Sequence, residues 1–409
     1  MLASIFSLLL GIGILLTGTG FLSTLLGVRA GIEGFSDSIT GLIMSAYYVG
    51  FALGTYICPA IIRRAGHVRA FAAMASIAST IPVFHVLIVG PVSWAVLRAI
   101  TGLCLVGLYM TIESWLNTLA SNETRGRLFS SYMTVTLVTQ ALGQYLILVG
   151  GIRTFEPFGL ISILLSIALV PVTLTRVPEP KPVETPSLQA SRLFQLAPLG
   201  TLGAFTAGLI NGAFWGMSAI YAFRMGLSHA GVAEFVSAAV LGGALLQWPI
   251  GRFSDGRDRR HVLTIVSLSA AVLAVVAFGF AYWSPIALIV CTFLYGGLAF
   301  TVYGLSVAHV NDFLQPEEVL EGTRTLLLLN GLGAIVGPAL SGWLMDLFQP
   351  GSLFLYFAVI LALFGGYGLI RRRAPIEVAR QTEFVPMGTS SATVVEMDPR
   401  TETALGDAA

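Results

Sequence analysis

Residues 246–260 read LQWPIGRFSDGRDRR, a cluster of four arginines and two aspartates between two long apolar stretches. Each flanking stretch, near 232–253 and 261–282, holds enough apolar residues to cross the roughly 30 Å core of a bilayer as a helix. The polar cluster is too short to form a domain, so we expect a tight charged turn at one membrane face. Such a turn suits a protein whose spanning helices move against each other.

The rest of the chain is similarly apolar. Of its 409 residues 56% are hydrophobic and only 11% are charged, whereas a soluble protein carries roughly a quarter charged residues. We therefore predict an all-α integral membrane protein. The net charge of +1 gives no overall field that would attract nucleic acid.

Cysteine usage and loop motifs argue against several kinds of chemistry. The three cysteines, Cys58, Cys104 and Cys291, lie inside apolar segments and are expected to be packing residues. No His or Cys cluster has metal-ligand spacing, and no GxxxxGK[ST] phosphate loop is present. We expect no metal, no cofactor, no ATP-driven step and no enzymatic activity.

Apolar stretches of bilayer length recur along the chain and predict twelve transmembrane helices. We divide them into a six-helix N-terminal bundle (1–177) and a six-helix C-terminal bundle (198–370), joined by a polar loop (178–197). A polar, disordered tail is expected at 371–409. The predicted spans are 4–28, 38–62, 69–89, 92–119, 128–149, 158–177, 198–223, 232–253, 261–282, 285–313, 323–347 and 352–370.

Basic residues fix the expected orientation. Eighteen Lys and Arg residues fall on the side of the even-to-odd connections and the tail, against three on the opposite side, and Arg98 lies within a span. The positive-inside rule places the first side, with both termini, in the cytoplasm. The expected location is the cell inner membrane.

The two predicted halves share positions. A shift of 194 residues brings Gly102, Tyr109 and Asn117 onto Gly296, Tyr303 and Asn311. Two six-span halves in the same orientation are what parallel repeats require.

Residues 4–370 resemble the major facilitator superfamily, on the twelve spans, the central loop and the loop signature G-x-L-x-D-R-x-G-R-R. In this chain 251–260 read GRFSDGRDRR, with Asp258 where the second glycine is usual. The loop near 59–66 carries Arg63 where the family copy has a carboxylate. Antiporters of the family carry GPxxGG in span 5, which here lacks proline, while a similar GAIVGPALSG stands at 333–342.

Span 4 carries the richest set of polar groups inside the predicted membrane. At 100° per residue, Arg98, Gly102, Tyr109, Glu113 and Asn117 fall on one stripe, which must face the interior because such groups are costly in lipid. Arg98 and Tyr109 are candidates for solute binding. Glu113 is too far along the helix to pair with Arg98, so we expect it to pair with Arg125 or Arg127 or to carry the coupled proton. The alternative is a polar network that only fixes helix packing.

The remaining candidates come from four other spans, from the connection before span 5 and from the charged turn. The resemblance implies that Asp255 docks at the start of span 5, residues 124–128, only when the cytoplasmic side is closed, where the positive end of the helix dipole would favour it; the alternative is a solvated anchor loop. The predicted solute-binding residues are Arg98, Tyr109, Gln140, Gln144, Asn211, Trp215, Gln247 and Tyr303; the proton-coupling candidates are Glu113 and His309; the gating candidates are Gly251, Arg252, Asp255, Arg259, Arg125 and Arg127.

Together these features predict a secondary active transporter. It would move a small organic solute by alternating access, coupled to protons, as a monomer in the bilayer. The mixed lining suits a polar or anionic metabolite better than a lipophilic cation. Two alternatives remain: efflux of drugs or metabolites, weakened by the missing span-5 motif, and a membrane sensor that does not transport.

Overall fold

The computed structural model describes residues 2–121, 124–175, 180, 190–315, 318–371 and 384–397. Most of the predicted central loop and two parts of the tail, 372–383 and 398–409, lie outside the described residues. Nearly all of the described chain is helical.

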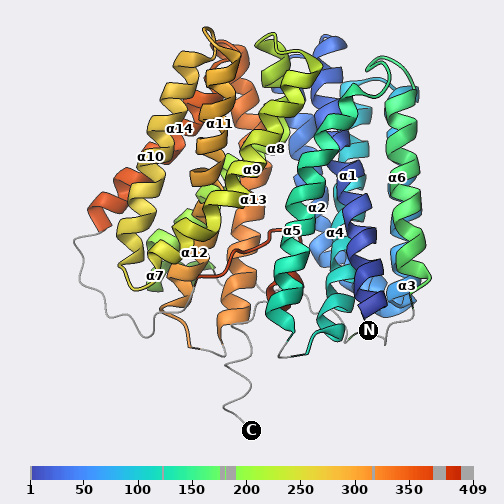
Figure 1. Cartoon of the computed structure of the whole chain (residues 1–409), viewed down its shortest axis with the longest axis horizontal. Helices are drawn as coiled ribbons and strands as arrows, with labels where there is room; N and C mark the ends of the chain where they lie inside the picture. The colour runs from blue at the N-terminus through green and yellow to red at the C-terminus, as the bar shows by residue number, and fades with distance from the viewer. Residues whose placement is uncertain are drawn as a thin grey trace.

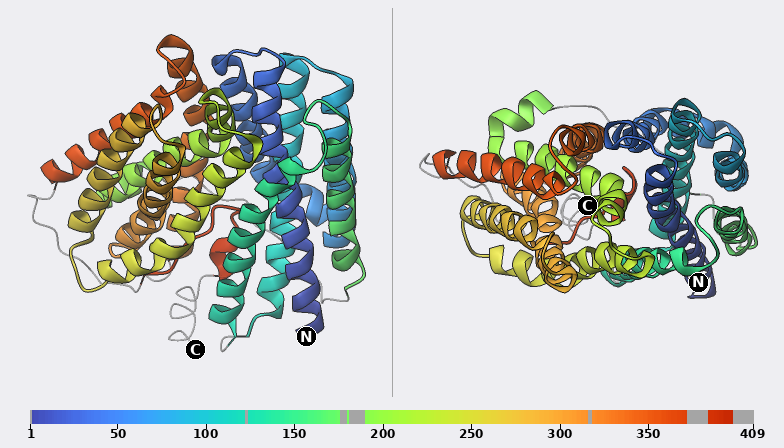
Figure 2. Two further views of the ribbon diagram at one scale, coloured as in Figure 1. Left: turned by 45° about the horizontal axis from the view of Figure 1, so that its top comes forward. Right: turned by 90° about the horizontal axis from the view of Figure 1, so that it is seen from above.

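The helices form two groups that stand side by side, α1–α6 and α8–α14 (Figures 1 and 2). Helices α11 and α12 continue one another at Phe300, and the short α7 precedes the second group. The bounds in the first group are α1 Leu2–Ile32, α2 Asp37–Ala65, α3 His67–Leu87, α4 Pro91–Leu119, α5 Arg125–Gln144 with η1 Tyr145–Leu148, and α6 Glu156–Thr173. The others are α7 Ala190–Leu196, α8 Pro198–Arg224, α9 His229–Ser254, α10 Arg259–Phe280, α11 Pro285–Ala299, α12 Thr301–Asn311, α13 Val319–Leu347, α14 Ser352–Arg371 and η3 Val394–Met397.

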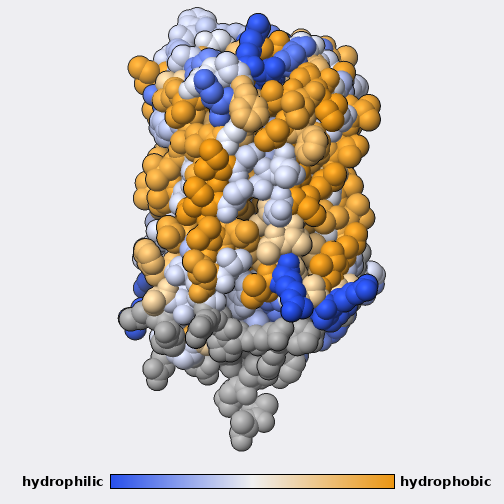
Figure 3. Space-filling view, turned by 90° about the vertical axis from the view of Figure 1, so that its right-hand side faces the viewer, coloured by the Kyte–Doolittle hydropathy of each residue, from blue (hydrophilic) through white to orange (hydrophobic). Residues whose placement is uncertain are grey.

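Ten stretches among the described helices have the length and hydropathy of membrane spans. Helices α5 and α8, which have more polar and small residues, pack alongside them and complete the predicted twelve. Apolar side chains cover much of the middle of the face shown in Figure 3, and hydrophilic residues gather toward its two ends. This is the surface of an all-helical, multi-span membrane protein.

Local sequence explains where the helices begin. Ser36, Ser228 and Ser284 are N-caps whose hydroxyls accept a hydrogen bond from the backbone N–H of the third helical residue, which satisfies a donor that the helix itself cannot. Pro91 and Pro285 stand in the first turn, where a missing N–H costs nothing. Gly66 turns the chain between α2 and α3 with φ of 82°, a conformation that favours glycine.

Small residues let the helices of each group approach closely. A side chain at Gly50 of α2 would collide with the carbonyl of Ala99 on α4, and one at Gly208 of α8 would collide with Asn330 on α13. Such contacts are typical of membrane helices, whose backbones approach where glycine removes the Cβ. The α2–α4 and α8–α13 pairs are thereby fixed within their own halves.

The end where the chain starts and the α2–α3, α4–α5 and α9–α10 turns lie is called the basic face here; it is the lower end in Figure 1. At the other end, called the opposite face, the halves touch directly. Gly41 of α2 lies against Pro338 of α13, and Gly27 of α1 against Ala219 of α8. The two halves therefore meet at the opposite face.

At the basic face a stretch of the tail lies between the halves. The sequence predicted disorder for 371–409, but residues 384–397 pass between the two groups of helices and most of their side chains are buried (Figure 2). Polarity alone suggested disorder, and what it missed is that Ser391 and Thr393 find polar partners inside the protein. The prediction of disorder is wrong for this stretch.

Candidate functional site

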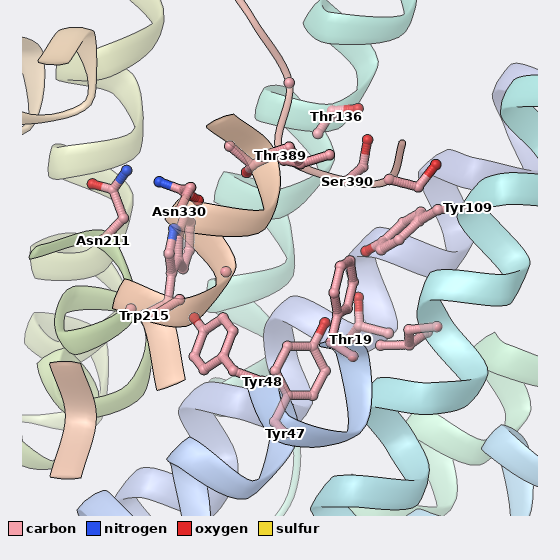
Figure 4. A pocket seen from close by; sticks show the side chains of 18 of the residues that line it. Thr19, Tyr47, Tyr48, Tyr109, Thr136, Asn211, Trp215, Asn330, Thr389 and Ser390 are labelled. Carbon is pink, nitrogen blue, oxygen red and sulfur yellow. The ribbon is translucent and has the colours of Figure 1, made fainter. Parts of the chain in front are cut away.

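A cavity of about 290 Å³ lies between the halves, a volume suited to a small solute. Its walls come from α1, α2, α4, α5, α8, α9, α12 and α13, and residues 387–392 of the tail border it (Figure 4). Because both halves contribute, a relative movement of the halves would change the access to the cavity.

The wall from the first half combines tyrosines with one buried arginine. Arg98, on α4, is 3% exposed, and its guanidinium carbon lies 4.6 Å from the ring centre of Tyr47 on α2, a cation–π contact. Its Nη2 donates to Ser23 Oγ at 3.5 Å, the outer limit of a hydrogen bond. Its Nε finds no hydrogen-bond partner among the described residues. Tyr48 and Tyr109 complete this wall (Figure 4).

The wall from the second half is aromatic with amide groups. Trp215 of α8 stacks on Phe300 at 6.1 Å between ring centres, with an interplanar angle of 8°. Asn211 Oδ1 and the Tyr303 hydroxyl are buried and have no hydrogen-bond partner within the described part of the chain. Asn330 donates to the carbonyl of Ala204 at 3.2 Å. Buried polar atoms without partners are rare in proteins, and in a cavity wall they suit a ligand.

The charge of the cavity lining is positive. Among the described lining residues the charged side chains are Arg98 and Arg324. Arg324 forms ion pairs with Glu321 at 3.5 Å and with Glu396 at 2.7 Å. No ion pair is seen for Arg98 within the described residues. A buried guanidinium is stable only when paired or well hydrogen-bonded, so this wall favours an anion.

Seven of the eight predicted solute-binding residues line the cavity, and their role in binding stays a prediction. The exception is Gln144, which accepts a hydrogen bond from the Thr24 hydroxyl and donates to the Gln140 carbonyl at 2.8 Å, so it joins α5 to α1. The seven are Arg98, Tyr109, Gln140, Asn211, Trp215, Gln247 and Tyr303.

Several lining residues did not stand out in the sequence. Tyr47 and Tyr48 are adjacent in α2, and Phe300 marks the break between α11 and α12. Two neighbouring tyrosines inside an apolar span were an available signal, because a phenol in lipid needs a polar neighbour. They carry neither a charge nor an amide, the groups on which the sequence prediction mainly rested.

Glu113 has partners other than the predicted arginines. Its carboxylate, fully buried on α4, accepts hydrogen bonds from the Tyr132 hydroxyl at 2.5 Å and from the hydroxyls of Ser390, Ser391 and Thr393. Arg125 instead donates to Asn117 at 3.1 Å and to the Glu396 carbonyl at 2.7 Å. The predicted pairing with Arg125 or Arg127 is therefore not observed.

The second proton-coupling candidate lies away from the cavity. His309 is buried on α12, with its ring centre 5.2 Å from that of Phe313 and close to Gly200 of α8. It is not among the residues that line the cavity.

The charged turn between α9 and α10 makes its contacts within the second half and with the tail. Asp255 Oδ1 accepts from Arg259 at 2.8 Å and from the backbone N–H of Phe384 at 2.9 Å. Arg259, 2% exposed, also pairs with Asp312 at 2.5 Å. Within the described residues Asp255 makes no hydrogen bond or ion pair to α5. Docking of Asp255 in a closed state stays a prediction.

The other gating candidates surround this turn. The guanidinium carbon of Arg252 lies 5.4 Å from the ring centre of Trp248, and Phe384 packs against Gly251. Arg127 is exposed on α5. Partial burial raises the pKa of Asp258, but hydrogen bonds from Arg260 outweigh it and leave that pKa below its usual range. Asp258 is thus charged at neutral pH and caps the start of α10.

A carboxylate gate that the sequence did not reveal closes the opposite face. Asp346, near the end of α13, accepts backbone hydrogen bonds from Asp37 at 2.9 Å and Ser38 at 2.8 Å, at the N-terminus of α2. Arg224, at the end of α8, donates to Asp37 at 3.2 Å and to the Phe35 carbonyl at 3.0 Å. An anion at a helix N-terminus is stabilised by the exposed N–H groups and the helix dipole. These contacts join the two halves.

Replacing Asp346 by asparagine is expected to loosen this gate. Loss of the anion at the α2 N-terminus costs about 1 kcal/mol, so the population open at the opposite face should rise about fivefold. The measurement is thiol labelling, from that face, of a reporter Ala52→Cys in the cavity wall. Glu234→Gln, an exposed change on α9, is the control, and unchanged labelling in Asp346→Asn would contradict the gate.

Comparison with known proteins agrees with this architecture. The sequence profile described as Major Facilitator Superfamily matches residues 2–319 and, in a second match, 200–395. The uncharacterised MFS-type transporter YcaD of Shigella flexneri serotype 5b (strain 8401) is 27% identical over 355 residues, which cover 86% of this chain and 92% of the relative.

Two solved structures share the fold. The nucleoside transporter NupG superposes with a TM-score of 0.68 at 15% identity, over 90% of this chain and 96% of NupG. A D-xylose–proton symporter gives a TM-score of 0.69 at 14% identity, over 93% of this chain and 99% of the symporter. At these identities the likeness concerns the fold alone.

Proposed function

The chain belongs to the Major Facilitator Superfamily and is a multi-pass secondary transporter rather than an enzyme, and we propose that its cargo is a small organic anion bound in the central cavity. The observation that carries this proposal is Arg98. It is a buried guanidinium in the cavity wall with no ion pair among the described residues. A carboxylate or phosphate on the solute would supply the missing negative charge.

The remaining lining describes the rest of the proposed solute. Asn211 Oδ1 and the Tyr303 hydroxyl offer hydrogen bonds on the side opposite Arg98 (Asn211 and Trp215 are labelled in Figure 4). Trp215 and Phe300 add a flat apolar surface on the same wall. The proposed solute therefore has an anionic group, an apolar or planar part and a polar group that donates a hydrogen bond.

Transport is proposed to proceed by alternating access. The opposite face is closed by the Asp346 and Arg224 contacts, and residues 384–397 stand between the halves at the basic face. On the positive-inside rule the basic face is cytoplasmic, which makes this an inward-facing conformation with both termini in the cytoplasm. The bacterial relatives favour the inner membrane as its location.

Coupling to protons is proposed to involve Glu113. It is a buried carboxylate on the same helix as Arg98, and Tyr132, which lines the cavity, donates to it. A carboxylate that is dry in one state and wet in another binds a proton differently in the two states, which is the requirement for coupling.

Ligand stabilisation of the detergent-purified protein tests the proposed cargo. A ligand that binds the folded state raises the melting temperature in proportion to the logarithm of its concentration over Kd. We expect small carboxylic acids to stabilise the protein more than their matched amides, between pH 5 and pH 8. Equal stabilisation by acid and amide would contradict an anionic cargo, and stabilisation only by lipophilic cations would favour efflux.

A further inference from the structure

Residues 384–397 touch both halves of the protein at the basic face. On the side of the second half, the Phe384 N–H donates to Asp255 and its ring lies against Gly251 and Gly304. At the other end of the segment, Arg324 of α13 pairs with Glu396 at 2.7 Å. The segment is therefore held at two places by the second half.

The first half holds the same segment by polar contacts. Asn117 of α4 donates to the Glu396 carboxylate at 3.2 Å, and Arg125 of α5 donates to its backbone carbonyl at 2.7 Å. The helical turn η3 packs against α4, α5 and α13. Glu396 thus contacts helices of both halves.

The middle of the segment covers a buried carboxylate of α4. The hydroxyls of Ser390, Ser391 and Thr393 all donate to Glu113, a carboxylate that is fully buried beneath them. Three hydroxyls within four residues of the segment thus satisfy one carboxylate. Without the segment this side of Glu113 would face the open cleft.

The segment also borders the cavity on its basic side. Residues 387–392 are part of its lining, and Met387, Ser391 and Ala392 are buried (Thr389 and Ser390 are labelled in Figure 4). A solute cannot leave toward the basic face through the volume that these residues fill. The halves also cannot close at that face while residues 384–397 stand between them.

We propose that the cleft at the basic face is a peptide-binding site, that its ligand is the chain's own segment 384–397, and that the occupied state does not transport. The polar groups fit this occupant, since the acidic Glu396 pairs with Arg324 and the backbone N–H of Phe384 donates to the Asp255 carboxylate. Covalent attachment through the chain gives a ligand of this kind an effective concentration of millimolar order. Transport would begin when the segment leaves.

The test compares two shortened chains, one ending at residue 383 and one ending at residue 397. The readout is the rate at which a thiol reagent labels Met133→Cys, a reporter on α5 beside Gly388, in protein that keeps the three buried cysteines. If the segment occupies its site nine-tenths of the time, the chain ending at 383 should label about tenfold faster than the full chain. The chain ending at 397 should label at the full-chain rate.

A point variant of the full-length chain shows whether faster labelling of the shortened chain reflects loss of the segment or misfolding. Glu396→Lys places a cation beside Arg324 and Arg125, and like charges at that distance should expel the segment. It should label faster, as the chain ending at 383 does, whereas Glu234→Lys on the exposed face of α9 should not. A synthetic peptide of residues 384–397, added at millimolar concentration to the chain ending at 383, should restore slow labelling.

Equal labelling of the full chain, the chain ending at 383 and Glu396→Lys would overturn the proposal, as would a peptide without effect. Only the statement that the occupied state does not transport rests on the proposed function. Labelling needs no transported solute, so a failure of the anionic cargo would leave this readout intact. If the occupied state does not transport, the chain ending at 383 should take up solute at a faster initial rate than the full chain. An unchanged or slower rate would overturn that statement.

Discussion

Replacing Arg98 by alanine is expected to abolish transport and to weaken solute binding by about 100-fold. Removing one partner of a buried charge pair costs about 2–5 kcal/mol, because the other charge is left in a dry site without compensation. In this protein the partner left behind is the solute's anionic group. The measurement is the Kd of a stabilising acid for the purified variant, together with its initial rate of uptake into proteoliposomes.

Two further variants separate the charge of Arg98 from its packing. Arg98→Lys keeps a cation but loses the planar group that lies over Tyr47, so binding should fall by about tenfold and not vanish. Arg69→Ala removes an exposed arginine from α3 and should leave Kd unchanged. Full binding in Arg98→Ala would contradict the assignment of the anion site, provided that the variant elutes as a single species from a sizing column.

Replacing Glu113 by glutamine is expected to abolish solute accumulation driven by a pH gradient while leaving solute exchange intact. Glutamine has nearly the same shape and still accepts hydrogen bonds from Tyr132, so the helix packing should survive. It cannot gain or lose a proton, and coupling requires a group whose proton binding differs between states. The measurement compares accumulation and counterflow in the same proteoliposomes.

Because the tail contacts Glu113, the effect of Glu113→Gln must be measured in a chain that lacks the tail segment. Ser390 and Ser391 donate to this carboxylate, so Glu113→Gln also changes how the segment 384–397 is held. The comparison is therefore made in the chain ending at residue 383, with and without Glu113→Gln. Undiminished pH-driven accumulation in the double variant would show that Glu113 does not carry the coupled proton.

The helices followed from the sequence because a membrane span must be long, apolar and internally hydrogen-bonded. Every predicted span overlaps a described helix, and the punctuating prolines at 91 and 285 stand in the first turn of α4 and α11. The polar stripe of α4 faced the interior as predicted, since Arg98 and Glu113 are both buried. These features depend on local composition and helical geometry, which a single sequence contains.

The contacts between the halves did not follow from the sequence. Asp346 lies more than 300 positions from Asp37 along the chain, and nothing local marks it as a cap for α2. The tail gave a misleading signal, because polar residues such as Ser390 and Thr393 usually indicate disorder. In this protein a buried carboxylate on another helix satisfies them.

Conformational state also lay beyond the sequence. Asp255 was predicted to contact the start of α5, a contact expected only when the basic face is closed. In this conformation Asp255 binds Arg259 and the tail. A single sequence serves both states of a transporter and does not indicate which is observed.

The measurement that tests the central claim most directly is uptake of a stabilising carboxylic acid by proteoliposomes under an imposed pH gradient. We predict saturable accumulation that reverses when the gradient is reversed and that is absent in Arg98→Ala. Uptake equal to that of protein-free liposomes, for every acid that binds, would contradict the account and leave a protein that binds the solute without moving it.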